Sequence, residues 1–322
     1  MGKKDNYNKL LDQVKIIADK PGMEIMDILG NKDLGICDKD PQYSPHTILK
    51  LSYLNYYLGV FLPIANKYSD NVVFIDVFSG SGLVKIKNTE YTVLGSSLLA
   101  AKSVINSRKG HNKKYGFDKI ISIELEKDKA ELLNSRFKAL NIQNARALCG
   151  DSNDIISNLT EECKIENNSI VLLFIDPEGM EPIFNKYIQF YDSVHRVDTI
   201  MNYSWGVIRV QGKLEKHLDN SDYIKLEERM KNFIPNYTVG DNPDEKFLEF
   251  FENEFGKPMG SGVNIHDIGK KVAYSMILRI NKTNSNTKWK EAMKDIENEI
   301  SRHNDKTSLE LLRTTFSGKT FF

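Results

Sequence analysis

The chain has 322 residues, of which 40% are hydrophobic and 27% charged, which suits a globular protein with one large α/β domain and additions, or with two domains. Its 44 basic and 44 acidic side chains cancel, which excludes a global basic field that would drive non-specific nucleic-acid binding. The longest apolar run, residues 170–175, is too short to cross a bilayer, and no apolar signal region follows the N-terminus, so we expect a cytoplasmic protein without a membrane partner.

The three cysteines, Cys37, Cys149 and Cys163, are scattered along the chain. They form no C-x-x-C pair, so they predict neither a disulfide framework nor a zinc site. We expect no metal site, and a reducing compartment suits these thiols.

Residues 1–43 are expected to form an N-terminal helical extension that packs on the rest of the chain or acts as a lid. A clearer helix follows, because Ser44 can cap it and Pro45 suits its first position. His46 and Lys50 are spaced i, i+4 and share a face near the start of this helix. They are either a solvated polar pair or the groups that face the carboxylate of an amino-acid-like cofactor.

The most informative stretch is an apolar run at residues 72–75, whose β-branched and aromatic residues predict a buried parallel strand. Asp76 ends this strand. A loop of mostly small residues comes next and contains Phe78, Ser79, Gly80, Ser81 and Gly82. Such a loop lets the backbone approach a ligand closely. The pattern favours S-adenosylmethionine (SAM), because a carboxylate at the strand end can meet the ammonium of its methionine part directly or through water.

Two other interpretations of this loop stay open. A dinucleotide site needs G-x-G-x-x-G, and Leu83 and Val84 do not continue that pattern after Gly80 and Gly82. A strand followed by an ordinary tight turn would need no ligand. Residues 83–94 then interrupt the alternation of strands and helices, either as a lid or substrate loop or as a surface insertion.

The second and third predicted strands lead into further polar residues. The second ends at Glu124 and Leu125, where an acid can hydrogen-bond the ribose hydroxyls of an adenosine cofactor. The third, residues 145–149, is followed by Asp151 and Ser152. Their side chains can reach an adenine amino group or cap the next helix, and the two roles can coexist.

The most apolar strand, residues 169–174, is expected near the centre of the sheet. It leads into Asp176, Pro177 and Glu178, and the proline fixes the backbone as it leaves the sheet. A junction of this kind can present side chains to the group being modified, or it can be structural only. We therefore predict that Asp176 contributes to cofactor binding and that Asp176 or Glu178 orients or deprotonates the nucleophile. Tyr203, at the end of the fifth strand, is a third candidate catalytic residue.

The whole chain then divides into four parts. Residues 1–43 are the extension, and residues 44–205 are the ligand-binding core. Charged helical segments fill residues 206–260, which we interpret as a cap inserted after the fifth strand, and residues 261–322 supply the last strand or strands and the C-terminal helices. The predicted fold is α/β and Rossmann-like, a mostly parallel sheet with helices on both faces and a helical insertion.

The glycine loop and the acids at four strand ends, Asp76, Glu124, Asp151 and Asp176, follow one another in the order that resembles the class I SAM-dependent methyltransferases. In more detail the chain resembles the three-Cys-motif partner (TcmP) family. The matching motifs are Pro45-His46-Thr47-x-x-Lys50, Phe74-Ile75-Asp76-x-Phe78-Ser79-Gly80-x-Gly82, Gly95-Ser96 and Phe174-Ile175-Asp176-Pro177-x-Gly179.

This resemblance implies a methyltransferase that uses SAM and works with a radical-SAM-type partner protein, which bears the three cysteines of the family name. Nucleic acid is the acceptor it favours, although Glu178 and Gly179 stand where amino-methylating nucleic-acid enzymes have a second proline and an aromatic residue. A non-catalytic SAM-binding partner or regulator of a two-protein system is the alternative, and it would need nothing from Glu178. A nicotinamide-dependent oxidoreductase is disfavoured, because the third glycine of its fingerprint is absent.

Overall fold

The computed structural model describes residues 3–20, 24–110, 115–204, 206–214, 220–267, 269, 271–281 and 288–317. Within these ranges the centre of the molecule is a seven-stranded sheet with the order β6-β5-β2-β7-β8-β10-β9. Its strands are β2 (Val72–Asp76), β5 (Lys119–Glu124), β6 (Ala145–Cys149), β7 (Ile170–Ile175), β8 (Arg196–Ser204), β9 (Met259–His266) and β10 (Val272–Ile280).

Most of this sheet is parallel. Strands β6, β5, β2, β7 and β8 pair in parallel, whereas β10 is antiparallel to both β8 and β9. The chain begins the sheet at β2, moves out to β5 and β6, and returns to β7 on the other side of β2. Ligands of open α/β sheets bind at such a reversal, outside the carboxyl ends of the strands. The predicted Rossmann-like α/β fold is confirmed.

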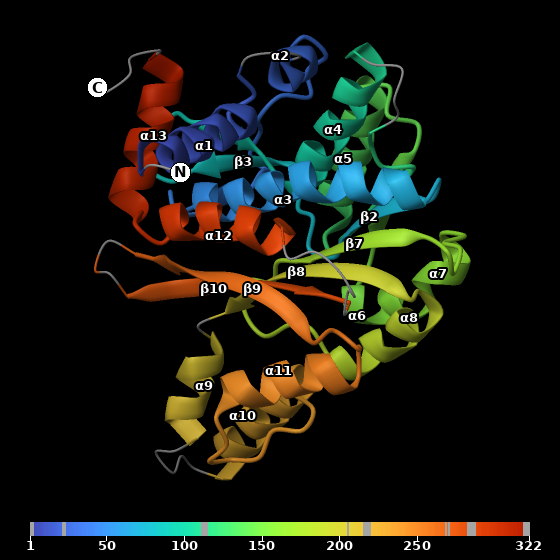
Figure 1. The fold of residues 1–322 in the computed structure, drawn as a ribbon, viewed down its shortest axis with the longest axis vertical. Helices are drawn as coiled ribbons and strands as arrows, with labels where there is room; N and C mark the ends of the chain where they lie inside the picture. The colour runs from blue at the N-terminus through green and yellow to red at the C-terminus, as the bar shows by residue number, and fades with distance from the viewer. Residues whose placement is uncertain are drawn as a thin grey trace.

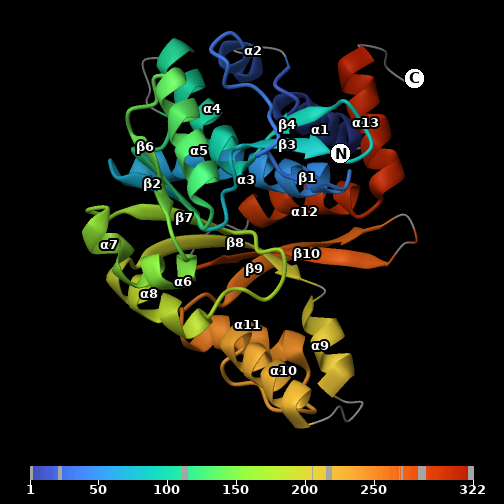
Figure 2. The same cartoon turned by 180° about the vertical axis from the view of Figure 1, so that it is seen from behind.

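Helices cover both faces of the sheet (Figures 1 and 2). One face carries α1 (Lys3–Ile17), α2 (Ile25–Gly30), α3 (Thr47–Tyr68), α4 (Ser96–Gly110), α5 (Lys127–Ala139), α12 (Lys288–Ile300) and α13 (Asp305–Ser317). The other carries α6 (Ser152–Ile155), the 3-10 helices η1 (Ile156–Asn158) and η2 (Phe184–Tyr187), α7 (Leu159–Glu162), α8 (Ile188–Ser193), α9 (Gly206–Leu214), α10 (Asn220–Phe233) and α11 (Pro243–Asn253).

Strand β2 shows why its sequence is continuously apolar. Val72 and Phe74 pack into the core on the α3 face, while Val73 and Ile75 pack into the core on the opposite face. Because helices cover both faces, every side chain of the strand is buried and no polar alternation is needed.

Helix α3 is the longest helix that the structure describes, and its length and apolar composition alone would allow it to cross a membrane. Its most apolar window is, however, 67% buried inside the protein, as expected for a core helix. The prediction that Ser44 caps this helix was wrong, since α3 begins at Thr47 with His46 at the N-cap position. The carbonyl of Ser44 instead accepts from the Thr47 backbone N–H at 3.0 Å, which closes a turn before the helix.

The segment after the glycine loop is an ordered hairpin of β3 (Leu83–Ile86) and β4 (Thr92–Leu94). Strand β1 (Gln42–Tyr43), from the N-terminal extension, pairs in parallel with β3 and completes a small three-stranded sheet. This sheet holds the end of the extension beside the glycine loop. Further along, α9, α10 and α11 form a block between β8 and β9, at the bottom of Figure 1.

Candidate active site

A cavity of about 540 Å³ opens over the carboxyl ends of β2, β5, β6 and β7. This is the edge of the sheet, and the point of strand reversal, at which the fold predicts a ligand. Eight of the residues predicted from the sequence line it: Phe78, Gly80, Glu124, Leu125, Asp151, Ser152, Asp176 and Glu178.

The glycine loop adopts a conformation that requires its glycines. Gly80 and Gly82 have φ angles of 58° and 97°, in the left-handed region. A Cβ added to Gly82 would lie 2.8 Å from Cδ1 of Leu133 and 3.1 Å from Cγ of Leu98, so these side chains would have to shift to admit it. The backbone N–H of Gly80 donates to Oε2 of Glu124 at 2.8 Å, and Ser79 donates its N–H to the carbonyl of Ile123 at 3.0 Å. The loop is therefore fastened to the end of β5.

A buried ion pair fixes the other side of the loop. The hydroxyl of Ser81 donates to Asp40, whose Oδ1 also lies 2.5 Å from Nη1 of Arg136. Arg136 further donates to the carbonyl of Ser81 at 2.9 Å and to carbonyls of residues 34 and 35. The extension is thereby clamped against the loop, and its Pro41 and Tyr43 form a wall of the cavity. Sequence reasoning missed this wall, because Asp40 and Arg136 are 96 residues apart.

Asp76 lies beneath the loop and does not line the cavity. Its Oδ2 accepts from the hydroxyls of Ser96 at 2.5 Å and Ser97 at 2.7 Å, whereas its buried Oδ1 has no hydrogen-bond partner. Burial, together with the nearby Asp176 carboxylate, raises the pKa of Asp76 to about 6 despite the two serine hydroxyls. An ammonium group near Oδ1 would satisfy the oxygen and stabilise its charge.

The raised pKa of Asp76 gives a testable pH dependence of stability. The folded state binds the Asp76 proton more tightly than the unfolded chain does, so this residue lowers the free energy of unfolding as pH rises from about 4 to about 6. Asp76→Asn lacks that titration, so relative to wild type it is expected to gain stability over this interval, by up to ~3 kcal/mol at neutral pH. Urea unfolding of both proteins from about pH 4 to about pH 8 measures the difference. The exposed Asp192→Asn is the control, and a pH-independent difference for Asp76→Asn would contradict the assignment.

Glu124 and Asp151 present carboxylates from neighbouring strands. Glu124 accepts from the N–H of Gly80 and, through Oε1, from the N–H of Glu126 at 2.9 Å, which leaves further lone pairs for a ligand. Asp151 is the N-cap of α6 and accepts from the N–H of Asn153 at 2.8 Å. Leu125 is 69% exposed at the mouth of the cavity, where a flat apolar group could cover it.

Each carboxylate oxygen of Asp176 has a partner, Lys50 or Asn202. Its Oδ2 lies 2.5 Å from Nζ of Lys50, and its Oδ1 accepts from Nδ2 of Asn202 at 3.0 Å. The Lys50 ammonium also lies over the rings of Tyr43 and Tyr274, at 5.5 Å and 5.8 Å from their centroids. Lys50 therefore neutralises Asp176, and it does not itself line the cavity.

Glu178 is the more accessible acid of the same loop. It is exposed, lines the cavity, and accepts a hydrogen bond from the hydroxyl of Tyr43 at 3.2 Å. Burial and the carboxylates of Asp176 and Glu178 raise the pKa of Tyr43, so its hydroxyl stays protonated and remains a donor. A carboxylate with one fixed partner and a free side can bind a proton from an acceptor.

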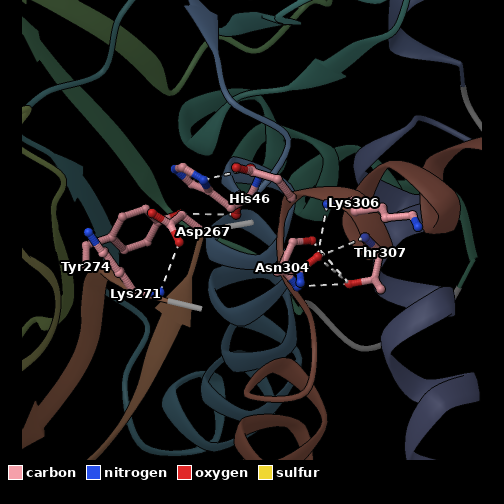
Figure 3. Close-up of polar contacts among 8 residues, drawn as sticks. His46, Asp267, Lys271, Tyr274, Asn304, Lys306 and Thr307 are labelled. Atoms are coloured by element: carbon pink, nitrogen blue, oxygen red, sulfur yellow. Dashed lines mark hydrogen bonds and ion pairs between the residues drawn. The ribbon is translucent and has the colours of Figure 1, made fainter. Parts of the chain in front are cut away.

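His46 and Tyr203 lie elsewhere. Nδ1 of His46 is 2.8 Å from Oδ1 of Asp305 at the start of α13. The backbone carbonyl of His46 accepts from the hydroxyl of Tyr274 at 3.1 Å (Figure 3). His46 thus ties α3 to α13 and β10. Tyr203 packs its ring 4.8 Å from that of Phe247, in the core on the opposite face from α3. The structure brings neither residue to the cavity.

The described lining of the cavity is acidic. It contains six carboxylates and one ammonium, that of Lys129, which lies 2.5 Å from Oε1 of Glu126. The cavity therefore suits a ligand with positive charge. Among the residues that the structure describes, no group of three or more His, Cys, Asp or Glu side chains could hold a metal ion, and Cys37, Cys149 and Cys163 are free.

No protein-family model matches this sequence, and no curated protein matches it. Solved structures with a similar arrangement include a protein from Legionella pneumophila, 13% identical, covering 77% of this chain and 90% of its own, with a TM-score of 0.44. The O-methyltransferase from Bacillus cereus, solved in complex with SAH, is 14% identical over 82% of this chain and 93% of its own, with a TM-score of 0.40. A SAM-dependent methyltransferase from Anabaena variabilis is 14% identical over 82% and 97%, with a TM-score of 0.36. Similarity this low carries no argument about function, so the site's own geometry has to supply one.

Proposed function

We propose that this protein binds SAM and transfers its methyl group to an acceptor. The observation that carries the proposal is the convergence of four strand-end segments on one cavity at the switch point of the sheet. These segments contribute Gly80, Glu124, Asp151 and the pair Asp176 and Glu178. SAM has a cationic sulfonium, an ammonium, a ribose diol and an adenine, and these groups suit the acids of the cavity together with Asp76 beneath it.

The residues present fit this cofactor. Gly80 leaves room for a ligand to pass close to the backbone, since a Cβ there would meet only Cγ of Pro41, at 3.8 Å. The unpartnered Oδ1 of Asp76, beneath the loop, is an acceptor for an ammonium, directly or through water. Glu124 would hold the ribose hydroxyls. The adenine would lie against Leu125 and hydrogen-bond Asp151 or Ser152. Phe78 would flank the methionine part, while Ser79 and Ser81 would support the loop through their bonds to residues 123 and 40.

SAM supplies an activated methyl group, so the protein mainly has to orient the acceptor and exclude water. Lys50 and Asn202 fix Asp176, which in turn sets the direction of the backbone at Pro177. Glu178 would then orient the nucleophile and accept its proton, with Tyr43 holding the carboxylate in place. Asp176 is a positioning residue in this scheme, because both of its oxygens already have partners.

Calorimetric titration with SAM and S-adenosylhomocysteine tests the proposal. Glu124→Ala removes a charge-assisted acceptor and is expected to weaken binding roughly ten- to hundredfold. Glu131→Ala, an exposed residue on α5 outside the cavity, is the matched control and is expected to bind as wild type does. Equal affinity of wild type and Glu124→Ala, or no binding by the intact protein, would contradict the cofactor assignment.

The methyl acceptor and the partner protein are proposed from the family resemblance alone. On that basis we propose a nucleic-acid acceptor and a radical-SAM-type partner protein. We also propose a cytoplasmic location, which rests on the scattered cysteines and the short apolar runs of the sequence. The acidic lining does not favour a polyanion, so an acceptor screen should include amines of small molecules and proteins beside RNA and DNA. Transfer of a labelled methyl group to one of these classes identifies the acceptor.

A second candidate is a non-catalytic SAM-binding partner or regulator of a two-protein system. The observation that favours it is the engagement of both Asp176 oxygens, by Lys50 and Asn202. A regulator would keep Asp76 and Glu124 for the cofactor and would need nothing from Glu178. The substitution of Glu178 described in the Discussion separates the two candidates.

A further inference from the structure

A second cavity, of about 430 Å³, lies between the β9–β10 hairpin and α11, on the face of the sheet opposite α12. It shares no lining residue with the cavity over β2. Phe247 and Leu248 of α11 form one side, and the other is formed by side chains of β9 and β10. The proposed function uses none of these groups.

The register of the hairpin gives the cavity its shape. Arg279 pairs with Gly260, Ile277 with Gly262, and Ser275 with Asn264, so alternate residues of both strands face the same side. Neither glycine adds a side chain, so Arg279 lies directly over Gly260 and a slot is left beside Ile277, opposite Gly262. From Arg279 to Ser275 the slot extends about 13 Å, at roughly 3.3 Å per strand residue.

The two ends of the slot differ in charge. At one end Arg279 is only 9% exposed, and its buried Nε has no hydrogen-bond partner. Within the described ranges no ion pair joins Arg279 to an acid. Burial lowers the pKa of Arg279, and the charge of Glu252 opposes this shift. At the other end Asp244 lies beside Tyr203, and Ser275 already donates to Asn264 at 2.6 Å. A buried guanidinium nitrogen without a hydrogen-bond partner is unfavourable, and a carboxylate is the best complement of a guanidinium.

We propose that this slot binds a small molecule with an apolar chain and a single carboxylate. The carboxylate would accept from the guanidinium of Arg279, which lines the slot, and the chain would run past Ile277 between Phe247 and the glycines of β9. The acid at the far end, Asp244, disfavours the reverse orientation. The proposal does not depend on methyl transfer or on SAM.

Calorimetry on the full chain with decanoate, decanol and decyltrimethylammonium as probes tests the proposal. We expect saturable binding of decanoate at one site and much weaker binding of the neutral and cationic probes. Arg279→Met keeps the apolar stem and removes the charge, so it is expected to weaken decanoate binding about tenfold or more. Arg313→Met, an exposed residue on α13, is the matched control and is expected to change nothing.

A second variant tests the cavity itself. Leu248 is 39% exposed on α11, so Leu248→Trp can place an indole in the slot without disturbing the buried core, and it is expected to abolish decanoate binding. Thermal unfolding of each variant confirms that it is folded. The proposal is overturned if wild type binds no decanoate, if decanol binds equally well, or if both folded variants bind decanoate as wild type does.

Discussion

Replacing Arg136 by methionine is expected to lower the free energy of unfolding by about 3–5 kcal/mol, because it leaves a buried charge without its partner. Neither Arg136 nor Asp40 has an exposed side chain, and Nη1 and Nη2 of Arg136 lie 2.5 Å and 2.9 Å from the two oxygens of Asp40. Although burial opposes it, hydrogen bonds from Arg136 and Ser81 hold the pKa of Asp40 below its usual value. Without the guanidinium, Asp40 would be an isolated buried acid.

Urea unfolding of the two single variants and the double variant Arg136→Met/Asp40→Leu measures this effect. The double variant is expected to recover part of the loss, since an apolar pair does not bury an isolated charge. Arg302→Met is the control, because the Arg302–Glu299 pair is 47% exposed on its arginine side and is expected to contribute at most about 1 kcal/mol. Equal losses for Arg136→Met and Arg302→Met would contradict the assigned role of the clamp.

The same clamp supports the wall made by Pro41 and Tyr43. Arg136→Met is therefore also expected to weaken SAM binding when it is measured without denaturant, at a temperature at which the variant stays folded. A variant that is folded and binds SAM as wild type does would show that the wall is not part of the cofactor site.

Glu178→Gln is expected to lower the rate of methyl transfer roughly 10²- to 10⁴-fold while SAM affinity stays near that of wild type. The amide is isosteric and keeps an oxygen for the hydroxyl of Tyr43, but it cannot accept a proton from the nucleophile. Single-turnover transfer of labelled methyl to the acceptor found by the screen, together with calorimetry, separates turnover from binding.

Glu181→Gln is a well-matched control for this experiment. Glu181 lines the same cavity, but its Oε2 accepts from the backbone N–H of Gly179 at 2.7 Å and so supports the loop. We expect its turnover to stay close to wild type. If Glu178→Gln and Glu181→Gln both transfer methyl groups as wild type does, Glu178 is not the base. If wild type and both variants bind SAM but none of them transfers a methyl group to any acceptor in the screen, the result favours the regulatory function.

The strand ends could be predicted from sequence alone because the information is local. The run at residues 72–75 is buried on both faces, so every position must be apolar, and the chain must become polar or small where the strand leaves the sheet. The same transition follows at Glu124, Asp151 and Asp176. Parallel strands end at one edge, and for this reason the sequence also predicted that these residues meet.

The partners of those residues depended on tertiary structure. Asp40 reaches Arg136, Lys50 reaches Asp176, and His46 reaches Asp305, each over a separation for which no sequence spacing is diagnostic.

At the end of β8, the sequence did not show which of two successive residues faces Asp176. Side chains of a strand alternate between faces, so Asn202 points to Asp176 while Tyr203, the next residue, points into the opposite core. The sequence by itself thus determined the sheet and its acidic edge, through burial and local chain breaks. Only the tertiary structure decided which of the edge residues face the cavity and which are neutralised, because long-range packing and strand alternation set those contacts.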